Sequence, residues 1–223
     1  MPNRIKILST KKLLPSQKRL FVDAKIVLSQ SDFIATQPVE FNLKNVNESL
    51  IFTSQNGILS VIQHPQFEQI KDRKMYCVGL KSKELLIANG CNVVAYAENA
   101  ADLAEAISLV YSHDSFTFFS GNLRRDELPF TLKKAKVDFN EIQVYETILT
   151  PKKNTIKQSG ILFFSPSAVE SYLKKNRIID EVCFCIGKTT GKELVKKKAS
   201  KIVMAPQPTV EALIEIVIDY YQS

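Results

Sequence analysis

The segment Cys185–Leu194, which reads CIGKTTGKEL, decides the fold because its pattern occurs twice in the chain. The segment Cys77–Leu85 reads CVGLKSKEL, with the same opening cysteine, glycine and closing Lys-Glu-Leu. In both copies a short apolar run leads through a glycine into an amphipathic stretch, a pattern typical of a strand followed by a helix.

Other matching pairs lie around these two segments. Leu162–Ala168 (LFFSPSA) resembles Ile51–Gly57 (IFTSQNG), and Ile7–Thr10 (ILST) has a counterpart in Phe118–Gly121 (FFSG). Val93-Val94-Ala95 followed by Leu103 likewise resembles Ile202–Ala205 followed by Leu213. Matching positions lie about 110 residues apart throughout, and this constant spacing predicts a duplicated unit.

Each predicted unit alternates short apolar runs with amphipathic stretches. This alternation predicts an α/β fold built on parallel sheets with right-handed crossovers. The predicted strands are 4–8, 50–53, 75–78, 93–96, 116–120, 142–146, 161–164, 182–186 and 201–204. The predicted helices are 57–64, 82–88, 100–111, 124–135, 167–176, 190–198 and 209–221. Capping-box patterns mark three helix starts, at Ser167-x-x-Glu170, Thr190-x-x-Glu193 and, more weakly, Asn99-x-x-Asp102.

Length and composition are those of an ordinary globular protein. The chain has 223 residues, 45% hydrophobic and 24% charged, enough for one large domain or two smaller ones. No apolar run approaches the roughly 18 residues of a membrane span. The opening Met1–Lys6 has no apolar signal core. We therefore expect a cytoplasmic protein with no membrane partner.

The charge balance is compatible with an anionic partner, and also with no role beyond solubility. Lys and Arg number 30 against 23 Asp and Glu, which gives a net charge of +7 and a pI near 9.1. Nucleic acid, an acidic membrane surface and a polyanionic small molecule are all compatible with this surplus. The visible lysine clusters also fit solvated helix faces.

Cysteine and histidine usage argues against a metal site. Four cysteines do not make a disulfide scaffold in a chain of this length, and Cys183 and Cys185 should share one face of a buried strand. His64 and His113 stand apart from each other and from the cysteines, whereas zinc sites need Cys and His at tight spacing. We expect no metal.

Four predicted strands end in small hydroxyl residues before a helix. These ends are Thr53-Ser54, Lys81-Ser82, Ser165-Pro166-Ser167 and Thr189-Thr190. Ligands of open parallel sheets bind outside the carboxyl ends of the strands, where helix N-termini offer free N–H groups. Carboxylates or phosphates would fit there, and helix capping alone is the alternative for each end.

Several sharper motifs are excluded. Gly187-Lys188-Thr189 resembles part of a phosphate-binding loop, but the required earlier glycine is replaced by Val182. No Gly-x-Gly-x-x-Gly is present, which argues against a dinucleotide cofactor. Two isolated histidines supply no Ser-His-Asp triad. Aromatic and basic residues do not interleave on strands, so a nucleic-acid surface is disfavoured. These exclusions predict an anion-binding cleft that uses no cofactor.

At the strand ends and strand–helix junctions described above, the sequence resembles the uroporphyrinogen-III synthase family. The matching blocks, in family order, are Phe52-Thr53-Ser54, Val144-Tyr145-Glu146-Thr147, Phe164–Val169, Ile186–Thr190 and Pro208–Leu213. The resemblance covers about residues 48 to 221. Where family members often end their first strand in Arg-Pro, this chain has Ser9-Thr10-Lys11-Lys12. Its first-repeat junction, Gly79–Ser82, lacks the usual threonine, and Gly57 stands where alanine is common.

The resemblance implies two flavodoxin-like, Rossmann-like α/β domains joined by a two-stranded linker. Residues 1–38 and 149–223 would form one domain and residues 39–148 the other, inserted into it. Thr36-Gln37-Pro38 and Tyr145-Glu146-Thr147 would be the hinge strands. A small contact between such domains would allow a cleft to close on substrate.

The resemblance also implies a reaction. Its substrate would be hydroxymethylbilane, a linear tetrapyrrole with eight carboxylates, which a monomeric lyase without a cofactor dehydrates and cyclises to uroporphyrinogen III with inversion of ring D. Tyr145 is the candidate proton donor, and an aromatic side chain packed at a hinge is the alternative reading. The candidate substrate-binding residues are Ser54, Ser82, Ser165, Ser167, Lys188, Thr189 and Thr190.

Two other function classes remain open from the sequence. A two-lobed module that captures an anion or solute without catalysis would keep the duplicated architecture. A nucleic-acid-binding protein would explain the charge, and steep loss of affinity with salt would reveal it.

Overall fold

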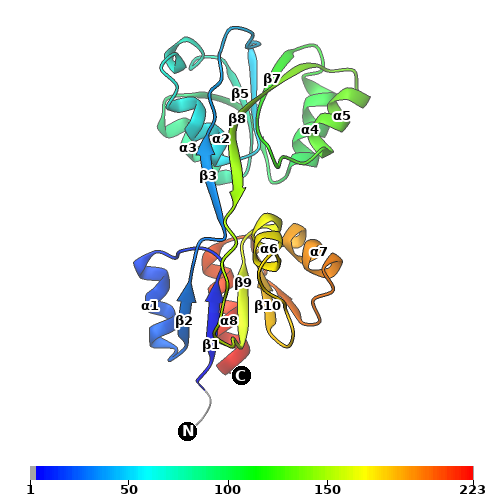
Figure 1. Cartoon of the computed structure of the whole chain (residues 1–223). Coiled ribbons are helices and arrows are strands. Elements are labelled where there is room, and N and C mark those ends of the chain that lie inside the picture. The colour runs from blue at the N-terminus through cyan, green and yellow to red at the C-terminus, as the bar shows by residue number, and fades with distance from the viewer. Residues whose placement is uncertain (1–3, 223) are drawn as a thin grey trace. The chain divides into compact units, whose positions relative to one another are not determined.

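The computed structural model describes residues 4–222, which divide into two compact units. Unit 1 combines the chain up to Ala35 with the chain from Ile148 onward, and unit 2 is Thr36–Thr147. Both are mixed α/β structures with mainly parallel sheets (Figure 1). Within the described residues no helix is long and apolar enough to cross a membrane.

Unit 1 holds a five-stranded sheet in the order β11-β10-β9-β1-β2. Every neighbouring pair in it is parallel. Its strands are β1 (Lys6–Ser9), β2 (Val27–Gln30), β9 (Gly160–Phe163), β10 (Val182–Cys185) and β11 (Ile202–Met204). Its helices are α1 (Pro15–Asp23), α6 (Pro166–Leu173), α7 (Lys188–Lys196) and α8 (Val210–Gln222).

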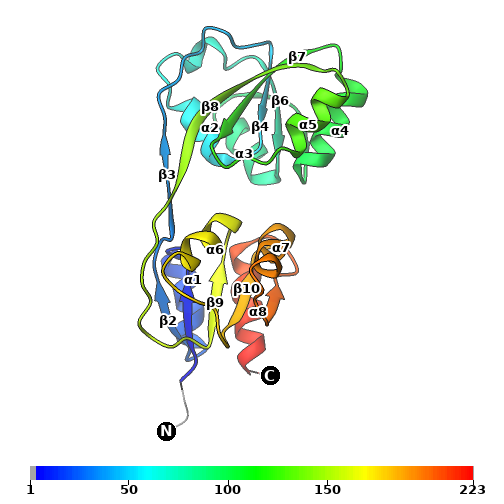
Figure 2. The same cartoon turned by 45° about the vertical axis from the view of Figure 1, so that its right-hand side comes forward.

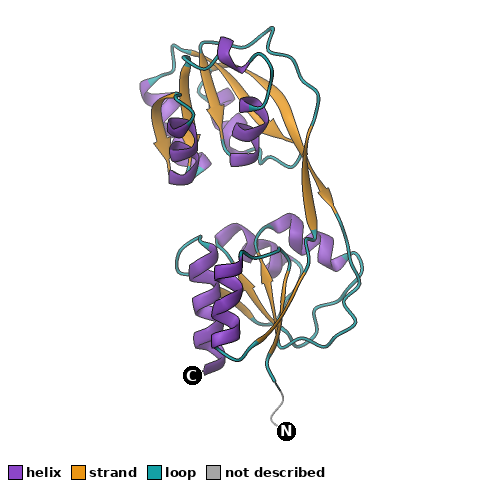
Figure 3. Cartoon of the chain, turned by 90° about the vertical axis from the view of Figure 1, so that its left-hand side faces the viewer, coloured by secondary structure: helices purple, strands orange, loops and turns teal. Residues whose placement is uncertain are grey.

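Both faces of the unit 1 sheet are covered by helices, as its two apolar clusters indicate. One cluster joins Phe21 of α1 and Leu213 of α8 to Ile7 of β1. The other joins Val169 of α6 and Leu194 of α7 to the opposite face. Figure 3 shows two helices side by side against one face of this sheet, and contacts between α1 and α8 identify them. Burial on both faces explains why β9 and β10 read as continuous apolar runs.

Unit 2 is built around a six-stranded sheet in the order β3-β8-β7-β4-β5-β6 (Figure 2). Its strands are β3 (Ile34–Pro38), β4 (Ser49–Phe52), β5 (Lys74–Val78), β6 (Asn92–Ala97), β7 (Ser115–Gly121) and β8 (Asp138–Leu149). Its helices are α2 (Gln55–Ile62), α3 (Leu80–Ala88), α4 (Ala100–Val110), α5 (Glu127–Lys134) and the 3₁₀ helix η1 (Phe67–Gln69). The strands from β8 to β6 pair in parallel.

Strand β3 runs antiparallel to β8, along the two stretches where the chain passes between the units. The Val39 N–H donates to the Val144 carbonyl (3.3 Å), and the Thr150 N–H donates to the Phe33 carbonyl (2.9 Å). As residue numbers rise from Phe33 to Val39, the numbers of their hydrogen-bond partners fall from Thr150 to Val144, and this order defines an antiparallel pair. The Gln37 side chain also donates to the Glu146 carboxylate at 2.6 Å.

The predicted α/β class is confirmed, and so is the buried strand carrying Cys183 and Cys185. The stretch between residues 9 and 49 contains α1, β2 and β3, whereas the apolar pattern predicted no element there and the resemblance implied only a hinge strand at residues 36–38. Helix α1 was missed because only Gln17 and Phe21 of its residues are buried, so its apolar pattern is weak. Strand β2 lies at a sheet edge and has no fully buried residue.

Two predicted capping boxes are wrong. Helix α6 begins at Pro166 after an N-cap Ser165, and α7 begins at Lys188 after Gly187, so Ser167 and Thr190 lie inside their helices. The third is confirmed as an N-cap, because the Asn99 side chain accepts from the Asp102 N–H at 3.0 Å. Hydroxyl residues are common both at N-caps and in first turns, and this ambiguity displaced the predicted start of α6 by one residue and that of α7 by two.

Candidate functional site

The carboxyl ends of β1 and β9 form the switch point of the unit 1 sheet. These strands are neighbours, but the chain leaves β1 for β2 on one side and β9 for β10 on the other. Helices α1 and α6 therefore depart to opposite faces, which leaves a crevice outside the strand ends. The residues that follow the two strands, Thr10-Lys11-Lys12 and Phe164-Ser165, meet at this edge.

Ser165 and Ser167 lie together at the start of α6. The Ser165 hydroxyl accepts from the Ala168 N–H at 3.1 Å, and its oxygen lies 2.9 Å from the Ser167 hydroxyl. Both side chains are partly exposed. Pro166 occupies the first helical position and has no N–H, so the Ser167 N–H is the first free donor of the helix. Two hydroxyls and one amide thus converge beside the switch point.

The start of α7 supplies a second group of donors, one strand further along. Gly187 is the extended N-cap of α7, and the Gly191 N–H donates to its carbonyl at 3.0 Å. Among the described residues no backbone acceptor takes the N–H groups of Lys188, Thr189 or Thr190. The Lys188 side chain is exposed and Thr189 is partly exposed, whereas Thr190 is 3% exposed. Burial therefore withdraws the Thr190 hydroxyl from solvent.

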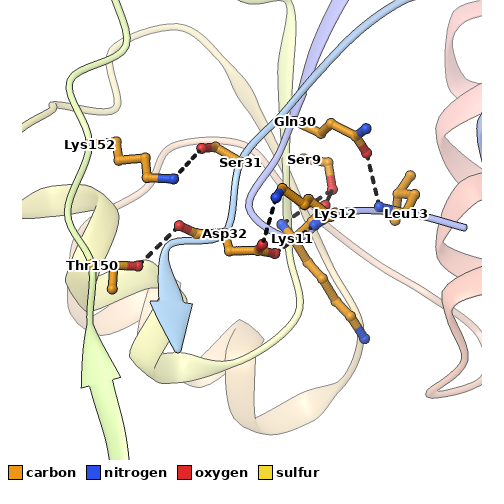
Figure 4. Close-up of polar contacts among 9 residues, drawn as sticks. All are labelled: Ser9, Lys11, Lys12, Leu13, Gln30, Ser31, Asp32, Thr150 and Lys152. Carbon is orange, nitrogen blue, oxygen red and sulfur yellow. Dashed lines mark hydrogen bonds and ion pairs between the residues drawn. The ribbon is translucent and has the colours of Figure 1, made fainter. Parts of the chain in front are cut away.

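Three lysines at the same edge were missed as site residues. Figure 4 shows Lys11 and Lys12 after β1, and Lys152 beside the loop after β2. The Lys152 ammonium donates to the Ser31 hydroxyl at 2.9 Å, and the Lys12 ammonium lies 3.9 Å from the Asp32 carboxylate. A sequence signal existed for two of them, because Ser9-Thr10-Lys11-Lys12 stands where the family that the sequence resembles often has Arg-Pro.

The nearby hydrogen bonds hold this loop region in place. The Asp32 carboxylate accepts from the Lys12 N–H (2.8 Å), and the Thr150 hydroxyl donates to the Asp32 carbonyl (3.0 Å). The Leu13 N–H donates to the Gln30 side chain at 2.9 Å (Figure 4). The Lys11 ammonium lies 6.0 Å from the centre of the Phe164 ring, on the β9 side of the switch point. Lys12 and Lys152 are thereby held beside the loop after β2, and Lys11 lies on the β9 side of the switch point.

Unit 2 has an equivalent switch point between β4 and β7, because α2 and α5 leave these neighbouring strands in opposite directions along the sheet. Ser54 follows β4 and caps α2, accepting from the Asn56 N–H at 3.2 Å. Ser82 does not occupy the predicted helix start. It lies inside α3, is 4% exposed, and its N–H donates to the Gly79 carbonyl. Burial removes the Ser82 hydroxyl from any ligand at this edge.

Tyr145 lies at the unit 2 switch point, across the end of β7. A Cβ atom on Gly121 would overlap the Tyr145 ring, and one on Gly57 would lie 3.7 Å from its Cε1 atom. The partly exposed Tyr145 lines a small cavity of about 150 Å³ with Gln37, Asn56 and other residues of β3 and α2. None of the described residues forms a hydrogen bond with its hydroxyl. The ring is therefore packed against glycine while its hydroxyl stays available.

The cysteines are poor candidates for catalysis. All four are buried, and burial raises the pKa of Cys77 to about 11 and that of Cys183 to about 12. A thiol with so high a pKa supplies almost no thiolate near neutral pH. Among residues 4–222 no group of three or more His, Cys, Asp or Glu side chains could hold a metal ion.

The strand ends therefore present groups that suit an anionic ligand. Free N–H groups at helix starts attract negative charge through hydrogen bonds and through the helix dipole. Hydroxyls add adaptable donors, and ammonium groups add charge. A ligand with several carboxylates matches this set of donors in each unit.

Comparisons with known proteins identify the family. A family model described as uroporphyrinogen-III synthase HemD matches residues 28–215. A search of curated protein sequences gives no significant match. Among solved structures, uroporphyrinogen-III synthetase from Helicobacter pylori is similar with a TM-score of 0.75 and 18% identity, covering 97% of this chain and 99% of that one. A mutant uroporphyrinogen III synthase from the extremely thermophilic bacterium Thermus thermophilus has a TM-score of 0.71 and 11% identity, covering 98% of both chains.

Proposed function

The chain belongs to the uroporphyrinogen-III synthase family, and from that premise we propose how its residues carry out the reaction. The family membership makes it a lyase of tetrapyrrole biosynthesis that acts on a small-molecule substrate. One observation carries this conclusion, the family-model match over residues 28–215. The solved relatives support it at the level of the fold.

The substrate of the proposed reaction is hydroxymethylbilane, which carries eight carboxylates. Loss of its terminal hydroxyl as water gives an electrophilic azafulvene that its pyrrole nitrogen stabilises. The substituted carbon of ring D attacks this centre, and the resulting spiro pyrrolenine fragments and recloses as the type III macrocycle. The bilane also closes without an enzyme to the symmetric type I isomer, so the protein must above all fix the position of ring D.

Carboxylate binding at the strand ends is the proposed means of positioning. In unit 1 the donors are the hydroxyls of Ser165 and Ser167, the N–H groups at the start of α7 and the Lys188 ammonium. This proposal is supported by the N–H groups of Lys188, Thr189 and Thr190, which have no backbone acceptor among the described residues. Donors fixed by helices cost little entropy when the substrate binds.

The unit 2 residues receive unequal support. Ser54 keeps its proposed role, because its partly exposed hydroxyl lies at the switch point beside β7. Ser82 is better regarded as a supporting residue, since its hydroxyl is buried and its N–H is bonded to Gly79. Free donors at this helix start come from Leu80 and Lys81 instead.

Tyr145 is proposed to give a proton to the leaving hydroxyl. Its support is a hydroxyl without a partner among the described residues, on a ring held over Gly121. A positioned phenol that donates in the transition state would make departure of water easier without a metal. The packed-aromatic alternative predicts instead that loss of the hydroxyl leaves the rate unchanged.

We propose further that the two units are copies of one flavodoxin-like domain. The strand order β11-β10-β9-β1-β2 of unit 1 corresponds, element by element, to β6-β5-β4-β7-β8 of unit 2. Ser165 and Ser54 cap corresponding helices after corresponding strands. Strands β3 and β8 would be the linker, with domain boundaries near residues 38 and 148. A cytoplasmic monomer that needs no cofactor stays a prediction.

The test is an isomer assay. Hydroxymethylbilane is generated in the cuvette, the purified protein is added without cofactor, and the oxidised products are separated into type I and type III. We expect predominantly type III product. Binding of the bilane followed by type I product alone would support the non-catalytic anion-binding module and overturn the proposed reaction.

A further inference from the structure

A cavity of about 670 Å³ lies in unit 1, away from the strand ends described above. Its walls come from residues 153–157, which precede β9, and from residues 172–181, between the end of α6 and the start of β10. Residues 178–181 lead directly into β10, whereas residues 153–157 run from the carboxyl edge, where the Lys152 ammonium bonds Ser31, towards the amino end of β9. Ser165 and Lys188 follow the carboxyl ends of the same strands, and neither residue is among those that line this cavity.

Side-chain hydrogen bonds hold the walls of this cavity in a fixed arrangement. The Asn154 N–H donates to the Asn176 side-chain oxygen at 2.7 Å. The Asn176 amide group donates in turn to the Lys152 carbonyl (2.7 Å) and the Tyr172 carbonyl (2.9 Å). These bonds fasten the loop before β9 to the end of α6. A preformed cavity of this volume is typical of small-molecule sites.

The cavity carries an excess of positive charge. Its cationic side chains are Lys153, Lys157, Lys174, Lys175 and Arg177, and its acidic ones are Asp180 and Glu181. The structure places none of the five cations in an ion pair with a described residue. The Glu181 carboxylate accepts from the Ile179 N–H at 2.7 Å.

Helix electrostatics explain only part of this charge. Lys174 and Lys175 follow the carboxyl end of α6, where cations are generally favourable. Lys153, Lys157 and Arg177 lie outside any helix, so the α6 dipole gives no reason for them. Three cations on two separate loops thus face one cavity without a structural partner.

Apolar surface completes the lining. Ile156 is 50% exposed and Ile179 is 69% exposed, and they come from the two opposing walls. Single exposed aliphatic residues are ordinary, but two that line one cavity beside cations form a surface of mixed character. Cations suit phosphate or carboxylate groups, whereas the isoleucines suit a flat apolar body.

We propose that this cavity binds a small organic anion, a phosphate or carboxylate group attached to an apolar ring system, at a site separate from the reaction. The anionic group contacts Lys157 and Arg177, and the ring lies against Ile156 and Ile179. The proposal does not depend on the reaction assigned above, because none of the residues that line this cavity is assigned a role in that reaction.

Methyl NMR of the full chain tests this proposal directly. Protein labelled at isoleucine δ1 methyl groups is titrated with ADP, which carries phosphates on a flat base, and with inorganic pyrophosphate, which has no apolar body. We expect ADP to shift the Ile156 and Ile179 signals with a Kd below about 1 mM, and pyrophosphate to bind more weakly. Absence of shifts at both methyls with ADP, or equal affinity for the two probes, would overturn the proposal.

Two double variants localise the effect. Lys157→Ala/Arg177→Ala should weaken ADP binding by about tenfold or more, whereas Lys192→Ala/Lys196→Ala removes two exposed lysines of α7 and should change it less than about twofold. If both double variants weakened ADP binding equally, the attraction would be non-specific and the proposed site would be contradicted. Type III formation by Lys157→Ala/Arg177→Ala should stay at the wild-type rate, which separates a failure here from a failure of the proposed reaction.

Discussion

Tyr145 joins a packed ring to a free hydroxyl, and substitution can separate the two. Tyr145→Phe keeps the ring over Gly121 and removes only the proposed proton donor. We expect the rate of type III formation to fall about tenfold or more, equivalent to about 1.4 kcal/mol in the barrier, with unchanged thermal stability. Steady-state kinetics with the isomer assay measures the effect.

Tyr96→Phe is the matched control for this substitution. Tyr96 lies on β6 of the same sheet and is 41% exposed, so loss of its hydroxyl should leave the rate unchanged. A wild-type rate in Tyr145→Phe would remove Tyr145 from the chemistry and favour the packed-aromatic interpretation.

Ser171 in α6 carries a structural defect that a substitution can relieve. Its hydroxyl is buried and has no hydrogen-bond partner among the described residues. Such a group loses its bonds to water on folding and gains none in return. Ser171→Ala should therefore raise the free energy of unfolding, by up to about 1 kcal/mol, and alanine also favours the helix.

Urea unfolding of the wild type, Ser171→Ala and Ser49→Ala checks this expectation. Ser49→Ala, the comparison variant, removes a buried hydroxyl that donates to the Asp114 carboxylate at 3.2 Å, so it should lower the free energy of unfolding. A loss of stability in Ser171→Ala similar to that in Ser49→Ala would show that the Ser171 hydroxyl has a partner after all.

At the scale of the element, the start of α7 is the clearest proposed anion binder. Lys188 is the first helical residue and follows an extended Gly187, a position where proline is tolerated. Lys188→Ala removes the ammonium group, and Lys188→Pro removes the ammonium group and the N–H together. We expect KM for hydroxymethylbilane to rise in both variants, by about tenfold more in the proline variant, because a charge-assisted hydrogen bond is lost as well.

Thermal unfolding provides the control for this pair, since both variants should remain as stable as the wild type within about 1 kcal/mol. Equal KM values for Lys188→Ala and Lys188→Pro would mean that the α7 amide does not contact the substrate. The binding role would then rest on side chains alone.

The sequence was sufficient for elements with a strong local pattern. Strands such as β9 and β10 are buried on both faces and read as continuous apolar runs, and Asn99 caps α4 as predicted. Helix α1 and strand β2 were missed because they bury few side chains. The predicted starts of α6 and α7 were displaced because their first turns contain hydroxyl residues that resemble caps.

Residues of the candidate site could be predicted only where their position between a strand and a helix is evident from the local sequence. Ser54 and Ser165 were predicted because each follows a strand and precedes a helix. Lys11 and Lys152 were not, because they approach one edge only through the strand order that sets β1 between β9 and β2. Burial of Ser82 likewise depends on how α3 packs, which residue order alone does not reveal.

At the scale of the whole molecule, the net charge of +7 suits a substrate with eight carboxylates. Salt screens such attraction, since the Debye length falls from about 10 Å at 0.1 M to about 3 Å at 1 M. We expect KM to rise with ionic strength while kcat changes little, because contacts that fix ring D are made at short range. Kinetics across a salt series checks this, and a KM independent of salt would argue against carboxylate binding by cations.

The central proposal is that donors at the strand ends position the substrate and so decide its isomer. Ser54→Asp and Ser165→Asp test it, because aspartate caps a helix as well as serine does but repels a carboxylate. Asn99→Asp makes a comparable change at the cap of α4 as a control. The measurement is the type III fraction of the product. We predict a marked shift towards type I in Ser54→Asp and Ser165→Asp and a wild-type fraction in Asn99→Asp, whereas wild-type type III fractions in all three would contradict the account.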